Sequence, residues 1–347
     1  MGIEIDLLSV GKGKRGGDAI ALRYGNLSDP NQQMVVVIDG GSIESGNELV
    51  GIIQNHYHTN DVDLVICTHT DGDHSSGLRP VLKELDVNLL WLHRPWAHSY
   101  AVRDAFKDGR ITSKSLSKNM QIAYDFAYEL ESIAKENKIS IEEPFAGMTF
   151  NGGAITILSP SEEYYESLIP TFTKTPQQIS EEVKAFGKIE EIEYGYEDMS
   201  MESELLDAKG ETSGENNSSV VALFQFDNKK FLFTGDAGVP TLINTIRFAR
   251  LMGVSLMDLH RFQIPHHGSH NNISPTILKY IKAEKAYVSA PPDNYKHPAK
   301  TVTNAFLRRE IPVFSTQGKS IRYHYNAPDR TGYKPAEKVP FFNKVEL

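Results

Sequence analysis

The stretch CTHTDGDHSSGL, residues 67–78, is unusually rich in histidine and aspartate. Four side chains that coordinate metal ions in proteins fall within six residues: His69, Asp71, Asp73 and His74. Imidazole and carboxylate groups suit zinc, manganese or iron. Residues two apart in an extended segment point to the same side, so the first three can converge, and His74 can reach from the adjacent position. The alternative is a polar turn that starts a helix, which does not explain so many ligands at one strand end.

Strand and helix patterns alternate on both sides of this stretch. The run that leads into it, 62–69, is apolar and rich in β-branched residues, as in a strand buried on both faces. Other strand-like runs lie at 3–10, 19–25, 33–42, 88–93, 219–226, 229–237, 259–269, 285–292 and 312–316. Helical patterns lie at 48–57, 76–85, 239–253, 274–285 and 297–311. The alternation predicts an α/β fold in which two sheets pack together with helices outside.

Composition limits the class of protein. Of the 347 residues 40% are hydrophobic, which is enough for one large domain or two. No apolar run is long enough to span a membrane, and we expect no signal peptide at the N-terminus. The single cysteine, Cys67, allows no intrachain disulfide, so a cytoplasmic protein is expected. The formal charge of −9 gives no general attraction to nucleic acid, although a local basic face is compatible with it.

Two segments interrupt the alternation within what we interpret as one domain, residues 1–347. Segment 94–140 is predicted to be a helical insertion, because 99–110 and 119–137 carry apolar residues at helical spacing. Segment 161–215 is predicted to be an acidic insertion, either a solvated loop or a lid over a cleft. The helical insertion also carries cations that could bind phosphate or simply face solvent: Arg94, Arg103, Lys107, Arg110, Lys114 and Lys118.

Three further stretches end strand-like runs with candidate ligands. They are FLFTGDA with Asp236, IPHHGSHNN with His266 and His267, and PPDNYKHPAK with His297. Alone, Asp236 is equally compatible with a helix cap. Adjacent histidines are usually explained by a metal ion or by oriented hydrogen bonds, since two neighbouring positive charges repel.

In this order the motifs resemble the metallo-β-lactamase fold superfamily. Its H-x-H-x-D-H motif corresponds to HTDGDH here, and Asp71 at the third position is similar to the hydrolase domain of ComEC-type competence DNA-uptake proteins. The stretches DAIAL, IDGG, TGDA, PHHGS and NYKHP resemble elements of the same branch. The resemblance covers most of the chain outside the two insertions. It implies a four-layered αββα fold.

The resemblance also implies a set of site residues and a cofactor. One or two divalent metal ions, zinc or manganese, are expected, with Asp236 bridging them. The implied ligands are His69, Asp71, Asp73, His74, Asp236 and His297. The implied supporting residues are Asp39, which would orient the site, and Asn217 and Ser218, which would lie near a substrate phosphate.

One position departs from the superfamily pattern. Where a histidine often serves the first metal ion, the strand ITILSP carries Ser159, a poor neutral ligand. The first ion site is then either weak or completed by another residue, for which His93 at the end of NLLWLH is a candidate. An oxygen-rich site shifts the metal preference from zinc toward manganese or magnesium.

The resemblance implies an enzyme that hydrolyses a phosphodiester through a metal-bound hydroxide. Asp73 would ligate a metal ion or accept a hydrogen bond from that hydroxide. Either His266 or His267 would protonate the leaving oxygen while the other ligates metal, and the sequence does not decide between them. DNA or another nucleic acid is the favoured substrate. A small-molecule phosphodiesterase and a catalytically weak binding or regulatory module on the same fold are the alternatives.

Overall fold

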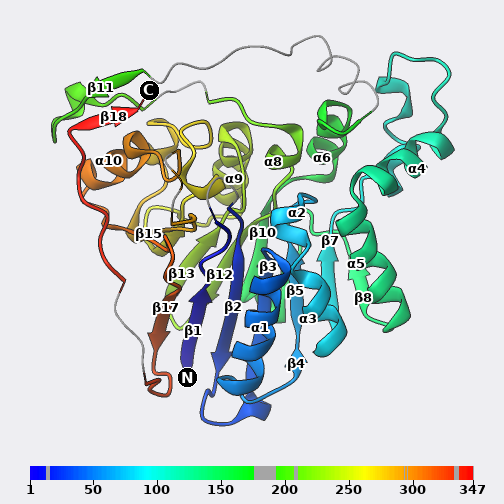
Figure 1. Cartoon of the computed structure of the whole chain (residues 1–347), viewed down its shortest axis with the longest axis horizontal. Coiled ribbons are helices and arrows are strands. Elements are labelled where there is room, and N and C mark those ends of the chain that lie inside the picture. The colour runs from blue at the N-terminus through cyan, green and yellow to red at the C-terminus, as the bar shows by residue number, and fades with distance from the viewer. Residues whose placement is uncertain are drawn as a thin grey trace.

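Two seven-stranded sheets face each other and helices cover their outer surfaces in the computed structural model of the chain (Figure 1). The structure describes residues 1–12, 16–175, 193–206, 210–292, 294, 296–331 and 336–346. This architecture confirms the α/β fold with four αββα layers. Among the described residues no helix is both long and apolar enough to cross a bilayer.

The first sheet combines antiparallel and parallel strands. Its order is β17 (Ile321–Tyr325), β1 (Gly2–Leu7), β2 (Ala19–Gly25), β3 (Gln33–Gly40), β5 (Leu64–Cys67), β7 (Leu89–Leu92) and β8 (Ser140–Glu142). The pairs β3–β5, β5–β7 and β7–β8 are parallel. Its outer helices are α1 (Ile43–Asn55), α3 (Leu78–Glu84) and α5 (Asp125–Glu136), and α4 (Ser113–Ala123) packs against α5.

The second sheet is parallel on one side. Its order is β16 (Val313–Ser315), β15 (Ala283–Val288), β14 (Leu259–Gln263), β13 (Lys229–Phe233), β12 (Val221–Phe226), β10 (Ile155–Ser159) and β9 (Thr149–Phe150). Its outer helices are α9 (Val239–Leu251) and α10 (Lys300–Arg308). The helix predicted at 274–285 is wrong: only a short 3₁₀ turn, Ile277–Lys279, forms, because the chain from Ala283 pairs with β14.

The two predicted insertions contribute different elements. Segment 94–140 supplies α4, α5 and β8, and α5 packs beside α3. Segment 161–215 supplies α6 (Glu162–Leu168), β11 (Tyr194–Tyr196) and α8 (Gly214–Asn217), while 176–192 and 207–209 lie outside the described residues. β11 pairs with β18 (Lys344–Glu346), and β4 (Asp61–Val62) pairs with β6 (Asp86–Val87).

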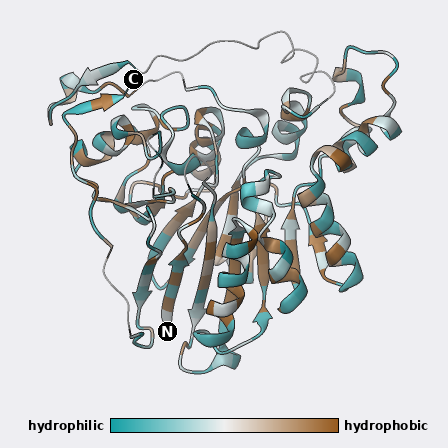
Figure 2. Cartoon of the chain, viewed as in Figure 1, coloured by the Kyte–Doolittle hydropathy of each residue, from teal (hydrophilic) through white to brown (hydrophobic). Residues whose placement is uncertain are grey.

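Successive side chains of a strand contribute in turn to the two apolar cores, one between the sheets and one under the helices. In β3, Val36 and Ile38 join the core between the sheets, whereas Val35 and Val37 join the core under the helices. Successive strand residues face opposite sides, so a strand covered on both sides is apolar throughout. Figure 2 shows hydrophobic colour along the central strands and polar colour on the outer helix surfaces.

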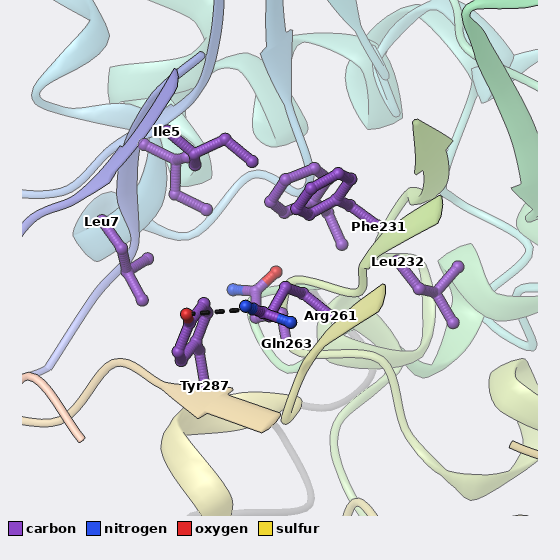
Figure 3. A pocket seen from close by; sticks show the side chains of 9 residues that line it. Ile5, Leu7, Phe231, Leu232, Arg261, Gln263 and Tyr287 are labelled. Carbon is purple, nitrogen blue, oxygen red and sulfur yellow. Dashed lines mark hydrogen bonds between the residues drawn. The ribbon is translucent and has the colours of Figure 1, made fainter. Parts of the chain in front are cut away.

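A small cavity remains between the sheets (Figure 3). Its volume is ≈ 30 Å³, and it is lined mainly by apolar side chains of β1 and β13. Arg261 and Tyr287 line its polar side, joined by a hydrogen bond of 3.1 Å from Nε to the phenol oxygen. A space of this size accommodates water but no substrate, so the functional site lies elsewhere.

Close backbone packing between α1, α3 and the end of β3 gives the first prediction. A Cβ at Gly77 would overlap the backbone oxygens of Gly40 and Ser42. Gly77→Ala should therefore lower the free energy of unfolding by about 2 kcal/mol or more, measured by denaturant titration. Gly51→Ala is the control, since its Cβ would meet only Asn55 at 3.8 Å. Equal denaturation midpoints for the two variants would contradict this account.

Candidate metal centre

The predicted ligands gather where strands of both sheets end. Asp39 lies at the end of β3, and His69 follows β5. The turn α2 (Gly72–Ser75) carries Asp73 and His74, near the ends of β3 and β5 (Figure 1). Asp236 follows β13, and the histidine pair follows β14. Because parallel strands end at one edge, residues far apart in the sequence meet there.

Four imidazoles surround the buried carboxylate of Asp236. On its Oδ1 side, His74 Nε2 lies at 3.3 Å and His267 Nε2 at 3.8 Å. On its Oδ2 side, His266 Nε2 lies at 3.6 Å and His69 Nε2 at 3.9 Å. Ligands bonded about 2.0–2.2 Å from a common ion are separated from one another by roughly 3–4 Å. The spacing therefore suits ions held between these atoms.

Asp39 fixes which nitrogen of His69 and His74 carries a proton. Its Oδ2 lies 2.8 Å from Nδ1 of His74, which donates to it. It also accepts bonds from the amide nitrogen and the hydroxyl of Thr68, at 2.7 and 2.6 Å. Because that hydroxyl gives its proton to Asp39, it accepts from His69 Nδ1 at 3.1 Å. Both histidines are thus left with a free Nε2 lone pair toward Asp236.

The other two histidines are oriented in the same way. His267 Nδ1 lies 3.1 Å from the carbonyl oxygen of Ser289, which can only accept. His266 Nδ1 lies 2.9 Å from Oδ1 of Asn272, whose amide nitrogen donates to the carbonyl oxygen of Asp236. Both rings therefore carry their proton on Nδ1 and present Nε2 to the site.

Unsatisfied buried atoms test whether a metal ion fits. Nε2 of His69, His74 and His267, together with Oδ1 of Asp236, are buried without a hydrogen-bond partner in the described part of the chain. Each such atom costs about 1–3 kcal/mol if it stays unpaired. A cation satisfies the lone pairs of nitrogen and carboxylate together, whereas no single hydrogen-bond donor reaches them all. The residues fit a divalent ion.

Electrostatics favour positive charge at the centre. Burial would lower the pKa of His74, but Asp236 and Asp39 outweigh it and raise the pKa. Burial would raise the pKa of Asp236, but His74, His266 and His267 hold it well below its usual range. An anionic surrounding that attracts a proton to His74 attracts a metal ion at the same place.

Most predicted ligands come together, but not all to the same degree. His69, His74 and Asp236 form one group whose ligand atoms lie within 4.8 Å of one another, and Asp73, His74 and His267 form a second. Asp71 is placed more loosely, with Oδ2 3.8 Å from Nε2 of His69.

His297 and the Ser159 alternative lie outside these groups. The ring of His297 lies 5.8 Å from that of His266, and burial lowers the pKa of His297 to about 3. No group of three ligand atoms among the described residues includes His297, so its ligation stays a prediction. His93, the candidate substitute for Ser159, stacks on Tyr165 with ring centroids 4.4 Å apart and joins no such group.

Asn217 and Ser218 are engaged within the turn around α8. The amide nitrogen of Asn217 donates to the carbonyl oxygens of Thr212 and Ser213, and Oγ of Ser218 donates to that of Glu215. Their contact with a substrate phosphate stays a prediction. The neighbour that reaches the site is Asn216, whose Nδ2 donates to Oγ1 of Thr212 at 2.7 Å and also lies 3.3 Å from Nδ1 of His266, where two donor nitrogens face each other.

Sequence reasoning also missed Asp18. Its carboxylate groups with those of Asp236 and the ring of His267 within 4.8 Å. Burial raises the pKa of Asp18 to about 8, against the lowering effect of His74. Only the stretch DAIAL, noted for its resemblance and not for its acid, pointed to this residue.

A separate acidic group is explained without a metal ion. His98, Glu162 and Glu166 place ligand atoms within 4.8 Å of one another. Both ring nitrogens of His98 already have partners, Glu166 at 2.8 Å and Glu143 at 3.2 Å. These contacts raise the pKa of His98 despite burial, as in an imidazolium held by two carboxylates.

Comparison with known families agrees with this architecture. Residues 31–141 match the model of the metallo-beta-lactamase superfamily. The matched residues run from β3 to β8 and include the HTDGDH loop. The match supports the superfamily predicted from the motifs, while the ComEC-type branch stays a prediction. A search of curated proteins gives no match.

Solved structures similar to this chain are distant. CmlA, a diiron β-hydroxylase from Streptomyces venezuelae, has 10% identity and a TM-score of 0.39 over 83% of this chain and 44% of its own. A long form RNase Z from yeast has 11% identity and a TM-score of 0.34, over 83% of this chain and 37% of its own. A motif mutant of a metallo-beta-lactamase from Cronobacter sakazakii has 11% identity and a TM-score of 0.30, over 70% of this chain and 66% of its own. At these TM-scores the likenesses carry no argument about activity.

Asp39 gives the prediction for this site. Asp39→Asn keeps the size of the side chain but offers one acceptor oxygen in place of the two that now receive three hydrogen bonds. The orientation of His69 and His74 should loosen, and affinity for Mn²⁺ should fall roughly 10- to 100-fold in a calorimetric titration. An unchanged affinity would show that Asp39 does not orient the ligands.

Proposed function

We propose that this chain is a metal-dependent hydrolase that acts on phosphodiesters with one or two divalent ions, manganese or zinc. One observation carries the proposal: the free Nε2 atoms of three buried histidines, His69, His74 and His267, converge on the unsatisfied carboxylate of Asp236. The match of residues 31–141 to the metallo-beta-lactamase superfamily is consistent with it. Whole-chain membership of that superfamily is part of the proposal.

We place two ions around Asp236. Asp73, His74 and His267 would hold one on the Oδ1 side, and His69 and Asp71 would hold the other on the Oδ2 side. Ions bound there would lower the pKa of water toward neutrality and offset charge on phosphoryl oxygens. The three carboxylates among these donors favour manganese over zinc.

The two pockets differ in strength. The pocket of Asp73, His74 and His267 has two nitrogen donors, whereas that of His69 and Asp71 has one. Ser159, where a third donor is often found, ends β10 with its hydroxyl buried and unpaired among the described residues. We therefore propose one tight and one weak ion.

The histidine pair has divided roles in this scheme. His267 is almost fully buried and acts as a ligand, which leaves His266 as the proton donor to the leaving oxygen. The side chain of His266 is 27% exposed, and its Nε2 is free to carry a proton because Asn272 holds Nδ1. Asp73 is exposed, and beside its role as a ligand it can accept a hydrogen bond from the attacking hydroxide.

Substrate size has two candidate answers. The resemblance to DNA-uptake hydrolases favours nucleic acid. The structure of the helical segment favours a small phosphodiester, because Arg94 pairs with Glu131 and Glu143, and Arg110 pairs with Asp108. Neutralised arginines provide less attraction for a polymeric phosphate backbone.

An activity screen tests the proposal. With Mn²⁺, the protein should hydrolyse DNA, RNA or a chromogenic phosphodiester. Asp236→Ala and Asp73→Ala should each lower the hydrolysis rate roughly 100-fold or more, because each removes a proposed ligand and weakens the binding of the metal ion. Asp63→Asn, at the opposite end of β5, is the matched control. If the wild-type protein binds no transition metal and cleaves none of the three substrates, the chain is a binding or regulatory module instead.

Salt dependence separates the two substrate sizes. For a polymer that contacts several phosphates, log affinity should fall with log salt by about 0.7–0.9 per phosphate contact. This is measured by fluorescence anisotropy with Mn²⁺ and the His266→Ala variant, which lacks the proposed proton donor but keeps the proposed ligands. A small phosphodiester should show a shallow slope in the KM of the wild-type enzyme. A shallow slope for both ligands would count against a nucleic-acid substrate.

A further inference from the structure

Asp18 is a buried carboxylate beside the proposed centre that has one engaged and one unengaged oxygen. It lies immediately before β2 and is 2% exposed. Its Oδ2 accepts a hydrogen bond of 2.7 Å from Nε2 of Gln263. The other end of that amide accepts from the backbone nitrogen of Thr234 at 3.0 Å, which fixes the orientation of Gln263. Oδ2 of Asp18 is therefore an acceptor for Gln263.

The second oxygen of Asp18 has a free lone pair that could bind a cation. Oδ1 is buried and has no hydrogen-bond partner among the residues that the structure describes. Ligand atoms of Asp18, Asp236 and His267 lie within 4.8 Å of one another, and so do those of Asp18, Asp39 and His74. A carboxylate packed beside two other carboxylates is unfavourable unless it stays protonated or a cation lies between them.

Two glycines allow this approach. A Cβ at Gly16 would lie 3.1 Å from the ring of His267, and one at Gly17 would overlap the carbonyl oxygen of Asp73. Gly17 also has φ +151°, in the region that favours glycine. The carbonyl oxygen of Gly17 accepts from Ser289, whose own carbonyl oxygen orients His267. The turn before β2 is thus packed directly against two proposed ligands.

We propose that Asp18 is a further carboxylate ligand of the ion held by Asp73, His74 and His267. This inference rests on the proposed function, because it deepens the description of the same centre. It explains why a side-chain-free turn is pressed against the site and why only one oxygen of Asp18 is paired. Without a cation, Asp18 would have to stay protonated beside Asp236.

The test is metal binding by Asp18→Asn, which keeps the size of the side chain and an oxygen for Gln263. Mn²⁺ titration by calorimetry should show the tighter binding step weakened roughly 10- to 100-fold, with the weaker step changed little. The melting temperature in EDTA should be equal to or higher than that of the wild type, because the amide fills the same space and cannot ionise beside Asp236 and Asp39. Asp63→Asn is the control and should match the wild type in affinity.

The outcomes separate this inference from the proposed function. Wild-type protein that binds no Mn²⁺ overturns both. Wild-type protein that binds Mn²⁺ while Asp18→Asn binds it within twofold of the same affinity overturns only the role of Asp18. A lower melting temperature in EDTA with unchanged affinity assigns Asp18 a structural role and also overturns it. Asp18→Ser repeats the titration without introducing an amide, and weaker binding in both variants supports the ligand role.

Discussion

The carboxylate of Asp39 is the constraint on which the centre depends. It is fully buried and accepts three hydrogen bonds, two from Thr68 and one from His74. A carboxylate has no proton to offer, so these contacts have one direction only. Because Thr68 donates its hydroxyl proton to Asp39, the same hydroxyl accepts from Nδ1 of His69. His69 and His74 therefore both present Nε2 as an acceptor. Any group that completes this site must therefore be a proton donor or a cation, and a cation reaches more of the acceptors.

The distance across the centre is set by packing between the sheets. Asp73 and His74 come from the first sheet, while Asp236 and the histidine pair come from the second. The layers are joined beside the site by a hydrogen bond of 2.9 Å from the backbone nitrogen of Val220 to the carbonyl oxygen of Thr68. Gly235, at φ +49°, lies so close that a Cβ would be 2.7 Å from Oγ1 of Thr68. Glycine at this crossing lets the two halves of the site approach.

Regular features were predictable and tertiary ones were not. The continuous apolar runs in 33–42 and 62–69 predicted β3 and β5, because strands covered on both faces require such runs. The pattern at 119–137 predicted one helix, but the structure has α4 and α5 with a break at Tyr124. Tyr124 is buried and donates to Glu215 at 2.7 Å, a contact 91 residues away that no local pattern contains.

The sequence by itself determined most of the side chains that could bind a metal ion, since HTDGDH, TGDA and PHHGS carry ligand-type side chains at the ends of strands. It also determined the layered α/β fold through the periodicity of its apolar residues. Only the tertiary structure decided how these side chains divide around Asp236, that His266 is the more exposed of the pair, and that Asp18 faces the site. The reason is physical: side-chain chemistry and periodicity are local properties, whereas distances between loops depend on how two sheets pack.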